Sequence, residues 1–560
     1  MNKPAVMQAS LEFPVKWDDP EEGSLLWTHD KMHYPYPETP LSFEILSGPI
    51  FARGITNALR SYGIPVKEIK CKRINSYLYW AVVPSVLPPE EMKARGKRSQ
   101  EAIMQTITEL GELWSRKWLS EIKQHLEYWD NLELQDASME KLMAHFESSL
   151  TRFERLIDIH FSLLLPSLVA ISEFEEMYKK LLGNQTIFDA HRLLQGFDNK
   201  TLETGRAIRN LARRAIRIPN VREIFEELPV RDILFELEKT SPGQEFLRDF
   251  REFLAIYGKR SEYISLQYPL WTEDPTPVLT NLKDYIKQLN PDSDTQTASL
   301  VNERERLIAE VSQKLQNHPK AIIEQFKSML AAAQTANMLS EEHTFWLDYG
   351  AFLRPRLLLL EIGRRFVEAG VMEKPEDIFY LLVEEIRETA KSLTKVNCKK
   401  LVQQRRSELE NFQKIQPPPI LGTAPLGSAP TDPVSKALGK LFGLPLTPST
   451  EPNSIKGNAG SSGKVRGFAK VVRSLGDAAK LQEGDVLVTE TTSPPWTPLF
   501  ATASAVVTDV GGILSHCAVV AREYRIPAVV GTGIATKTIR DGQFIEVDGD
   551  SGTVTVLNSP

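Results

Sequence analysis

The chain has 560 residues, of which 42% are hydrophobic and 25% charged, as in a soluble globular protein of about two to four domains. The 73 acidic and 67 basic residues leave a net charge of −6, which argues against nucleic acid as the main partner, because phosphate neutralisation needs a basic surface. We find no run of 18 apolar residues and no signal peptide, so the sequence predicts a cytoplasmic protein without a membrane segment. The spacing of Cys71, Cys398 and Cys517 fits neither a disulfide framework nor a metal site.

The N-terminal part divides into two stretches of different composition. The first 90 or so residues give no clear secondary-structure pattern and are rich in prolines and aromatic residues, including Trp27, Tyr34, Tyr36, Phe43, Tyr77, Tyr79 and Trp80. From about residue 95 to 413, Leu, Glu, Lys, Arg and Ala recur with helical spacing, as in residues 343–370. We therefore predict one large, mainly helical domain over residues 1–413.

Residues 414–463 differ from their surroundings because they are dense in Pro, Gly, Ser and Thr. This composition predicts a mobile interdomain linker, interrupted by a short helix at 433–442. A linker of this length suggests that the domain after it has to travel between two places.

The period of the apolar residues changes from 3.6 to 2 after residue 464. Short β-branched runs, such as DVLVTE, SAVVTD and PAVVGTG, alternate with helical segments at 474–481, 496–503 and 516–524. Residues 464–560 are therefore predicted to form a compact α/β domain.

One segment of this domain carries residues suited to chemistry. The predicted strand SAVVTD ends at Asp509, Gly511 and Gly512 allow a sharp turn, and Ser515 is a suitable N-cap for a helix that begins at His516. The free N–H groups at a helix N-terminus stabilise added negative charge, and a neutral imidazole is a competent nucleophile. His516 is thus a candidate phosphoryl carrier, although the same pattern would fit a structural histidine at a turn.

The stretch Gly511-Gly-Ile-Leu-Ser-His516-Cys-Ala-Val-Val-Ala-Arg-Glu523, followed by Ile526-Pro-Ala-Val-Val-Gly531, resembles the phosphohistidine swivelling domain of the phosphoenolpyruvate-utilising dikinase family. The resemblance covers residues 460–560. It implies that His516 accepts a phosphoryl group and carries it between two active sites. The expected architecture is therefore multidomain, with a large, mainly α-helical acceptor-binding domain and a C-terminal α/β swivelling domain.

Two departures refine this resemblance. Leu514 stands where the phosphoenolpyruvate enzymes usually have Thr, and Cys517 stands where they usually have a small residue. Leu-Ser-His is closer to rifampicin phosphotransferase and to the histidine-carrying subunit of phenylphosphate synthase. The chain shows no ATP-grasp pattern, so the resemblance implies a separate ATP-grasp subunit that binds Mg²⁺ and ATP and leaves the β-phosphoryl on His516.

The implied reaction delivers this phosphoryl group to a hydroxyl of a small acceptor, a phenol or a similarly apolar alcohol. Segments around Trp27 and His33, and the stretch 342–381, resemble the acceptor-binding domains of these enzymes. His33 and His343 are candidates for the base that takes the hydroxyl proton. Candidates for phosphate binding are Gly511, Gly512, Ser515, Arg354, Arg356 and Arg364.

Other interpretations remain open at this point. The chain could be a non-catalytic phosphocarrier that passes phosphate to another protein, or a self-sufficient phosphoenolpyruvate-dependent enzyme, against which Leu514 and the lack of a barrel domain argue. The candidate histidines and arginines could be core or salt-bridged residues, and the aromatic residues could be core rather than an acceptor pocket. The basic run Arg206, Arg209, Arg213, Arg214 and Arg217 fits a solvated helix face, or a docking surface for the partner. Cys517 is expected to pack, and Arg522 to anchor its helix.

Overall fold

A computed structural model describes residues 13–557 of the chain, apart from 184–185, 187, 289–295, 394, 424–431, 444–450 and 452. The chain forms two compact units, each assembled from separate stretches of sequence. Unit 1 comprises residues 1–164, 263–268 and 346–430, and unit 2 comprises residues 165–262, 269–345 and 431–560.

Unit 1 contains a four-stranded antiparallel sheet in the aromatic N-terminal region for which the sequence gave no clear pattern. Its strand order is β2-β3-β1-β4, with β1 at Trp27–His29, β2 at Val66–Ile74, β3 at Tyr77–Pro84 and β4 at Ile420–Leu421. Asn75 and Ser76 join β2 to β3 with positive φ angles of 49° and 69°, as a tight hairpin requires. Trp27 and Tyr79 are buried in the core of this sheet, so they pack as core residues.

The helices of unit 1 are α1 (Pro40–Ser42), α2 (Pro49–Ser61), α3 (Pro89–Leu113), α4 (Leu119–Asp130), the first part of α5 (Met139–Leu182), α13 (Pro355–Glu368), α14 (Val383–Lys391) and α15 (Lys399–Phe412). The helices after residue 95 fall in the region of predicted helical spacing, whereas α1 and α2 lie in the N-terminal stretch without a clear pattern. Shorter turns of 3₁₀- or π-helix are η1 (Pro20–Ser24), η2 (Phe43–Ser47), η3 (Trp114–Trp118), most of η5 (Thr344–Ala351) and η6 (Pro375–Tyr380).

The helix α5 is long and apolar enough to cross a membrane by length and composition, although the sequence has no unbroken run of 18 apolar residues. Of its most apolar 18-residue window, 72% is buried inside the protein. A buried core helix passes the same test, so this helix is weak evidence for a membrane span.

A six-residue strap, residues 263–268, belongs to unit 1 although the chain on both sides of it belongs to unit 2. Ser265 donates a hydrogen bond to the buried carboxylate of Glu38 (3.0 Å), and the Leu266 N–H donates to Ser42 (3.1 Å). The buried Arg356 guanidinium donates to the Leu266 carbonyl oxygen at 2.5 Å. These contacts fix the strap with buried polar partners.

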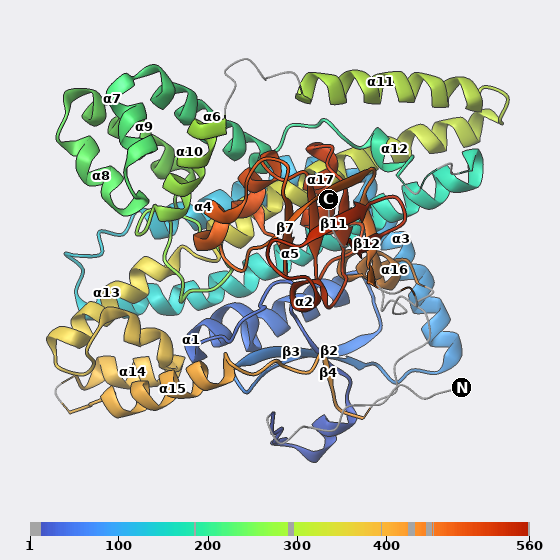
Figure 1. The fold of residues 1–560 in the computed structure, drawn as a ribbon. Helices are drawn as coiled ribbons and strands as arrows, with labels where there is room; N and C mark the ends of the chain where they lie inside the picture. Colours follow the sequence, from blue (N-terminus) through green and yellow to red (C-terminus); the bar gives the residue numbers. More distant parts are fainter. Residues whose placement is uncertain are drawn as a thin grey trace. The chain divides into compact units, whose positions relative to one another are not determined.

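Unit 2 begins with a helical part, which Figure 1 shows with α6–α10 gathered as one bundle in green. The helices are α6 (Lys200–Arg217), α7 (Pro219–Glu227), α8 (Val230–Glu238), α9 (Ser241–Tyr257), α10 (Thr276–Gln288), α11 (Gln296–Leu315) and α12 (Lys320–His343), together with the end of α5 and the short η4 (His191–Leu193). Residues that face inward from α6 to α10, such as Phe225, Phe246 and Leu282, form one continuous core.

The other part of unit 2 is an eight-stranded sheet in the order β5-β12-β11-β7-β8-β9-β10-β6. Its strands are β5 (Ser454–Lys456), β6 (Asn458–Ser461), β7 (Lys464–Val471), β8 (Val486–Thr489), β9 (Ala505–Thr508), β10 (Ala528–Val530), β11 (Phe544–Asp548) and β12 (Thr553–Val556). Its helices are α16 (Pro433–Phe442), η7 (Leu475–Lys480), η8 (Pro494–Ala501), α17 (His516–Glu523) and α18 (Ala535–Thr538).

Strands β7 to β10 are parallel, and their residues alternate between two cores. In β9, Val506 packs with Trp496 and Val520 on one face, whereas Val507 packs with Ala535 and Ile545 on the other. This two-sided burial explains the unbroken β-branched runs of the sequence. The predicted fold class, a large helical part followed by an α/β domain, is confirmed.

The expected short helix at 433–442 is present as α16. Residues 424–431, 444–450 and 452 of the predicted linker lie outside the described residues, and the domain boundaries at 413 and 463 stay a prediction.

Replacing Val506 with Ala removes two buried methyl groups from the central strand β9. We expect the sheet domain to lose about 1.5–2.5 kcal/mol of unfolding free energy, from lost burial and the cavity left behind. Urea denaturation followed by hydrogen exchange in β8–β10 measures this loss. The matched control is Val86→Ala, because Val86 is 98% exposed; equal effects of the two substitutions would contradict the assignment of Val506 to the core.

Candidate functional site

The site is built on the predicted strand–turn–helix unit. β9 ends at Thr508, Gly511 and Gly512 form the turn, and His516 is the first residue of α17. Gly511 has a φ of +114°, a conformation that side chains rarely adopt, and a Cβ there would lie 2.9 Å from the Ser515 hydroxyl oxygen. The sequence thus predicted both the turn and the position of His516 at the helix N-terminus.

Asp509 ties the end of β9 to the loop that follows β10. Its buried carboxylate accepts hydrogen bonds from the Thr532 hydroxyl (3.1 Å), the Thr536 N–H (3.2 Å) and the Thr536 hydroxyl. These bonds satisfy a buried charge and hold the base of the turn. Asp509 is therefore part of the framework of the site.

Ser515 occupies the N-cap position, in an extended conformation, but it makes no capping hydrogen bond. Its hydroxyl is buried and has no hydrogen-bond partner among the residues that the structure describes. A buried hydroxyl beside His516 is thus free to donate to a further group.

The imidazole of His516 faces a buried carboxylate from a distant part of the sequence. Its Nδ1 lies 3.1 and 3.3 Å from the two carboxylate oxygens of Glu341, near the end of α12. Glu341 is only 4% exposed and also accepts a hydrogen bond from the Thr201 hydroxyl at 2.9 Å. Sequence reasoning missed Glu341, because Glu341-Glu342 at a helix end reads as ordinary surface charge.

The charge state of Glu341 determines which ring nitrogen of His516 carries the proton. Burial alone would raise the pKa of Glu341, but His516, Thr201 and His343 outweigh it and lower this pKa below the ordinary value. A carboxylate can only accept, so Nδ1 of a neutral His516 is the protonated nitrogen and Nε2 keeps its lone pair. Nε2 is buried and has no hydrogen-bond partner within the described part of the chain.

A second buried carboxylate, that of Glu523, lies on α17, two turns after His516. Glu523 is 8% exposed and accepts the Gly196 N–H at 3.2 Å with both oxygens. Burial raises the pKa of Glu523 to about 7, and the nearby Glu341 charge adds to this effect. The region around α17 is therefore acidic on the side that faces the helical part of unit 2.

The other candidates near α17 have structural roles. Cys517 is buried, and burial raises the pKa of its thiol to about 12, so it packs as an apolar residue, as expected. Arg522 donates to the carbonyl oxygens of Gly460 (2.8 Å) and Ile513 (3.0 Å), which anchors the helix as predicted.

His343 lies in unit 2 at the end of α12, two residues after Glu341. It is buried, and its Nδ1 lies 3.2 Å from the Leu339 carbonyl oxygen one turn earlier. Its charge helps to lower the pKa of Glu341. The structure thus brings His343 close to the carboxylate that holds His516.

His33 lies in unit 1, where its Nδ1 is 3.0 Å from both oxygens of the buried Asp30 carboxylate. Burial would lower the pKa of His33, but the charge and hydrogen bond of Asp30, with a contribution from Asp348, raise it. A second pair of the same kind, which the sequence did not indicate, is His160 with Asp348, whose atoms lie 3.0 Å apart.

The three candidate arginines also lie in unit 1, and each has partners there. Arg354 pairs with Asp130 at 3.2 Å. Arg356 is 3% exposed and lies over the Phe379 ring, in addition to its bond to the strap. Arg364 pairs with Glu361 at 2.7 Å and with Glu368. Their predicted role in phosphate binding stays a prediction.

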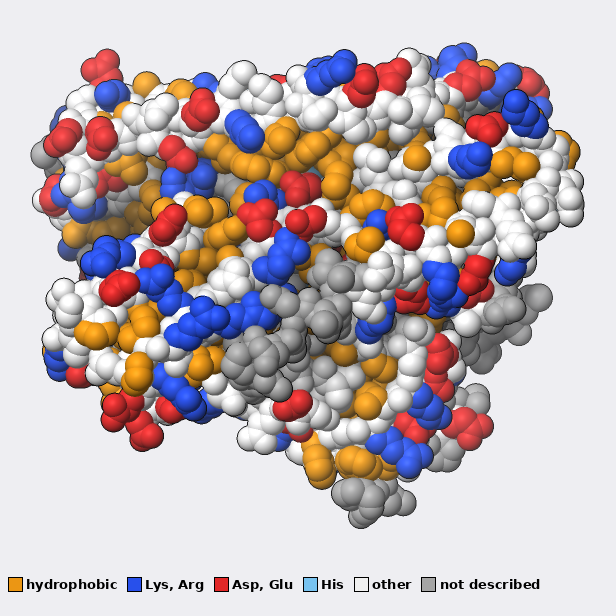
Figure 2. Space-filling view, turned by 90° about the horizontal axis from the view of Figure 1, so that it is seen from above, with side chains coloured by type: hydrophobic (Ala, Val, Ile, Leu, Met, Phe, Trp, Pro, Cys, Tyr) orange, Lys and Arg blue, Asp and Glu red, His pale blue; other side chains and the backbone are white. Residues whose placement is uncertain are grey.

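Two arginines of the basic run on α6 are paired with acids from neighbouring segments. Arg206 pairs with Asp198, and Arg214 pairs with Glu245 at 2.9 Å. On the face drawn in Figure 2, basic and acidic side chains are likewise interspersed. This arrangement is typical of a solvated surface.

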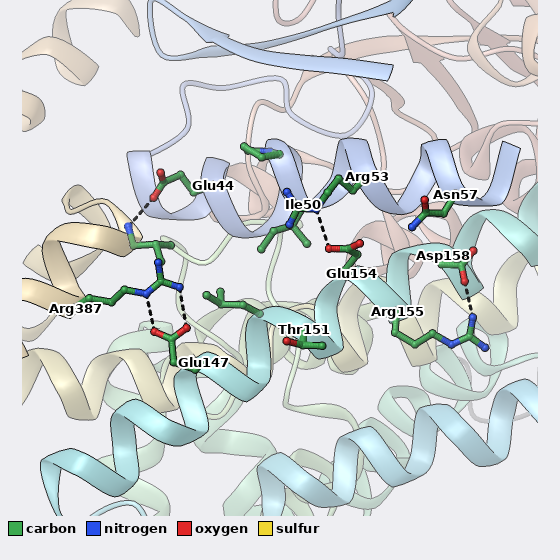
Figure 3. A pocket seen from close by; sticks show the side chains of 13 residues that line it. Glu44, Ile50, Arg53, Asn57, Glu147, Thr151, Glu154, Arg155, Asp158 and Arg387 are labelled. Carbon is green, nitrogen blue, oxygen red and sulfur yellow. Dashed lines mark hydrogen bonds and ion pairs between the residues drawn. The ribbon is translucent and has the colours of Figure 1, made fainter. Parts of the chain in front are cut away.

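A polar groove of about 690 Å³ lies in unit 1 between α2, α5 and α14, and none of the candidate residues lines it (Figure 3). Its arginines are neutralised across the groove: Arg53 pairs with Glu154 at 2.8 Å, and Arg387 binds Glu147 through two hydrogen bonds of 2.7 Å. These arginines are already paired with glutamates, so the volume of the groove alone does not identify it as a binding site.

Two family models match the chain. Residues 481–552 match the mobile domain of PEP-utilising enzymes, and residues 160–341 match the fourth domain of rifampicin phosphotransferase. His516 lies in the first match and Glu341 is the last residue of the second, so the contact between them joins the two matched regions.

Three curated relatives extend this similarity. Chondramide synthase cmdD of Chondromyces crocatus is 38% identical over 98% of this chain and 14% of its own length. An uncharacterized phosphotransferase, YvkC, of Bacillus subtilis is 30% identical over 95% of this chain and 62% of its own. Rifampicin phosphotransferase of Streptomyces sviceus is 30% identical over 71% of this chain and 44% of its own. The chain therefore spans less than two thirds of each of these relatives.

The similarity to phenylphosphate synthase in particular stays a prediction. The motif around His516 suggested a broader kinship, and the two domain matches and the named phosphotransferases confirm it. The chain thus contains one region similar to the mobile domain of PEP-utilising enzymes and another similar to the fourth domain of rifampicin phosphotransferase, and it resembles these phosphotransferases.

Proposed function

We propose that this chain is the part of a phosphotransferase in which His516 carries a phosphoryl group to a hydroxyl of a small-molecule acceptor. The observation that carries the proposal is the contact between His516 Nδ1 and the buried Glu341 carboxylate. This contact directs Nδ1–H toward the carboxylate, so in the neutral imidazole Nε2 holds the lone pair that acts as the nucleophile.

In the loading step, Nε2 attacks the phosphorus of the donor, an N–P bond forms, and the P–O bond to the leaving group breaks. The imidazole becomes cationic as the bond forms, because Nδ1 keeps its proton while Nε2 bonds to phosphorus. The first N–H groups of α17 and the free Ser515 hydroxyl are suited to bind the phosphoryl oxygens. Transfer to the acceptor reverses these bond changes and restores the neutral imidazole.

Loading requires a rearrangement within unit 2, because Nε2 is buried in the arrangement described here. The contacts between the sheet domain and the helical part include polar bonds, among them the Leu475 N–H to Glu262 at 2.6 Å and Arg525 to Glu303 at 2.8 Å. Leu202 of α6 also packs against the core of the sheet domain. A phosphoryl group on Nε2 would add negative charge next to Glu341. This repulsion opposes the return of the loaded domain, so the described arrangement fits the unloaded histidine.

The donor in this proposal is ATP with Mg²⁺, bound by an ATP-grasp protein that supplies its β-phosphoryl. The greater length of the relatives supports a nucleotide-binding part outside these 560 residues. Sequence motifs for phosphate binding by P-loops do not occur in the chain, which also supports a donor site elsewhere.

The acceptor is a small molecule, with a phenol or similar alcohol as the specific proposal. Relatives include a rifampicin phosphotransferase, a chondramide synthase and the prodigiosin synthesizing transferase PigC of Serratia marcescens, which supports small-molecule chemistry. In unit 1, the half-buried rings of Tyr36, Tyr263 and Tyr268 lie against one another, with centroids 5.2 and 5.0 Å apart. Such a cluster is suited to bind an aromatic ring.

The acceptor hydroxyl must lose a proton, and unit 1 offers two histidines that are each oriented by an aspartate. The raised pKa of His33 favours its cation, which would attract the transferred phosphoryl, and His33 acts as a base once that proton has left. His160 with Asp348 is the second candidate, and it lies against the rings of Phe161 and Phe352.

Incubation of the chain with Mg-ATP tests the carrier role. With extract from its source cells we expect one phosphoryl adduct on the peptide that contains His516, and none for His516→Ala. His318→Ala is the matched control, since His318 lies outside the site, and it should be labelled normally. Mass spectrometry at neutral to alkaline pH preserves phosphohistidine. Labelling of His516→Ala at the same level would overturn the proposal.

Glu341→Ala tests the tautomer of His516. We expect ¹⁵N NMR of histidine-labelled protein to show Nδ1 protonated in the wild type, and a mixture of tautomers in the variant, because the carboxylate that holds Nδ1–H is gone. The signal is assigned by its absence in His516→Ala. An unchanged tautomer in Glu341→Ala would refute the role given to this carboxylate.

Asp30→Asn tests the acceptor side. We expect His516 to load normally with Mg-ATP and extract, but to transfer its phosphoryl to phenol about 10²-fold more slowly, because His33 loses its orienting charge. Formation of phenyl phosphate is followed by ³¹P NMR, with Lys97→Ala on the exposed face of α3 as the control. If loading occurs but neither wild type nor control phosphorylates phenol, and the phosphoryl passes to a protein in the extract, the phosphocarrier interpretation replaces the enzyme one.

A further inference from the structure

The helix α16 lies inside the stretch that the sequence marks as a linker, yet it is firmly placed. Asp432 caps it by accepting the Ser435 N–H at 2.9 Å, and Pro433 occupies its first turn. Val434 and Ala437 are buried, at 8% and 1% exposure. A plain spacer helix would not need a buried face.

The C-terminal end of α16 is bonded to the histidine loop. The Gly512 N–H donates to the Leu441 carbonyl oxygen at 2.8 Å, and the Leu514 N–H donates to the Lys440 carbonyl oxygen at 3.0 Å. A helix leaves its last carbonyl groups without internal partners, and here the loop that precedes His516 supplies them.

The fit between these two segments depends on glycine. A Cβ at Gly512 would lie 2.1 Å from the Lys440 carbonyl oxygen, and one at Gly443 would lie 2.8 Å from the Gly511 carbonyl oxygen. Any side chain at Gly512 would therefore push α16 away from the loop. Gly512 therefore allows the His516 loop to approach the backbone of α16 closely.

Lys440 also connects α16 to the helical part of unit 2. Its ammonium group lies 2.9 Å from a Glu175 carboxylate oxygen on α5 and 3.6 Å from Glu176. Burial alone would raise the pKa of Glu175, but His191 and Lys440 outweigh this effect and lower it to about 2. The Glu175 carboxylate is therefore charged. One residue thus holds the histidine loop through its carbonyl group and α5 through its side chain.

We propose that α16 is a clamp that positions the His516 loop and travels with the sheet domain, while the Lys440–Glu175 pair is a latch that breaks when that domain leaves. This inference rests on the proposed function, which requires such a departure.

The two attachments of α16 differ in strength, which decides which one breaks. Separating α16 from the His516 loop would break two main-chain hydrogen bonds and pull apart two closely packed backbone segments. The latch, in contrast, is a single ion pair, in which the Lys440 and Glu175 side chains are 22% and 17% exposed. Salt screens an ion pair of this kind but hardly affects the main-chain bonds. The clamp therefore persists while the latch opens and closes.

Two variants separate the attachments in the full chain. Lys440→Met keeps the apolar stem and removes the ammonium group, with Lys436→Met as its matched control on the exposed side of α16. Gly512→Ala displaces α16, with Gly476→Ala as its control, because a Cβ there meets only ordinary contacts, the nearest at 3.4 Å. Thermal melting establishes that each variant is folded.

Potassium phosphoramidate serves as the probe of opening. In this reaction Nε2 attacks phosphorus and ammonia leaves, so labelling of the His516 peptide reports exposure of Nε2 without any partner protein. For Lys440→Met we expect labelling several-fold faster than in the wild type, with unchanged hydrogen exchange in α16. For Gly512→Ala we expect fast exchange throughout α16. High salt should accelerate labelling of the wild type more than that of Lys440→Met.

Unchanged labelling in Lys440→Met would overturn the latch, and exchange in its α16 as fast as in Gly512→Ala would overturn the clamp. If Gly512→Ala does not fold, the wild type is the reference, and exchange in α16 of Lys440→Met that is faster than in the wild type would overturn the clamp. Hydrogen exchange needs no phosphoryl transfer, so a failed proposed function would appear separately, as a wild type that Mg-ATP and extract never label.

Discussion

A buried carboxylate that faces an imidazole sets the conditions for the rest of unit 2. Glu341 is almost inaccessible to water, and such a charge is stable only when every neighbour compensates it. Thr201, His343 and His516 share this task, from α6, the end of α12 and the start of α17. The contact requires the helical part and the sheet domain to approach closely, and it fixes which nitrogen of His516 carries the proton.

The same pairing makes this arrangement sensitive to what His516 carries. A neutral imidazole satisfies the Glu341 charge, whereas a phosphorylated one would bring further negative charge into a region that already holds Glu523. In the proposed function, the loaded histidine therefore keeps the sheet domain away from Glu341 until the phosphoryl group has been transferred. The electrostatic balance of this one buried contact thus changes with the reaction.

Most of the sheet domain could be predicted from the sequence, because its local signals agree with its tertiary structure. The β-branched runs became β8, β9 and β10, and the Gly511-Gly512 turn placed His516 at the start of α17. The N-terminal sheet could not be predicted, since β1 pairs with β4 almost 400 residues later and its aromatic residues follow no simple alternation. Pairing at such separation leaves no local pattern.

Only the part of the site that is formed by residues adjacent in sequence could be predicted. His516 and its turn have a sequence signal, whereas Glu341 and Asp30 act through contacts that only the folded chain creates. Carboxylates of this kind look like the many surface acids of the helices, and nothing in their neighbourhood marks them as buried. The glycines of the turn were correctly located, but the partner of Gly512 proved to be a helix in the presumed linker.

The strap at residues 263–268 has a consequence for how the chain can be dissected. Because the chain passes between the two units at residues 164, 262, 268, 345 and 430, no single cut releases either unit whole. A truncation after residue 345 would leave unit 1 without α13–α15 and unit 2 without its sheet. Each unit is assembled from three separate stretches of the sequence. A variant that lacks one half of the chain would therefore lose activity because it cannot fold, and such variants would not locate the residues needed for activity.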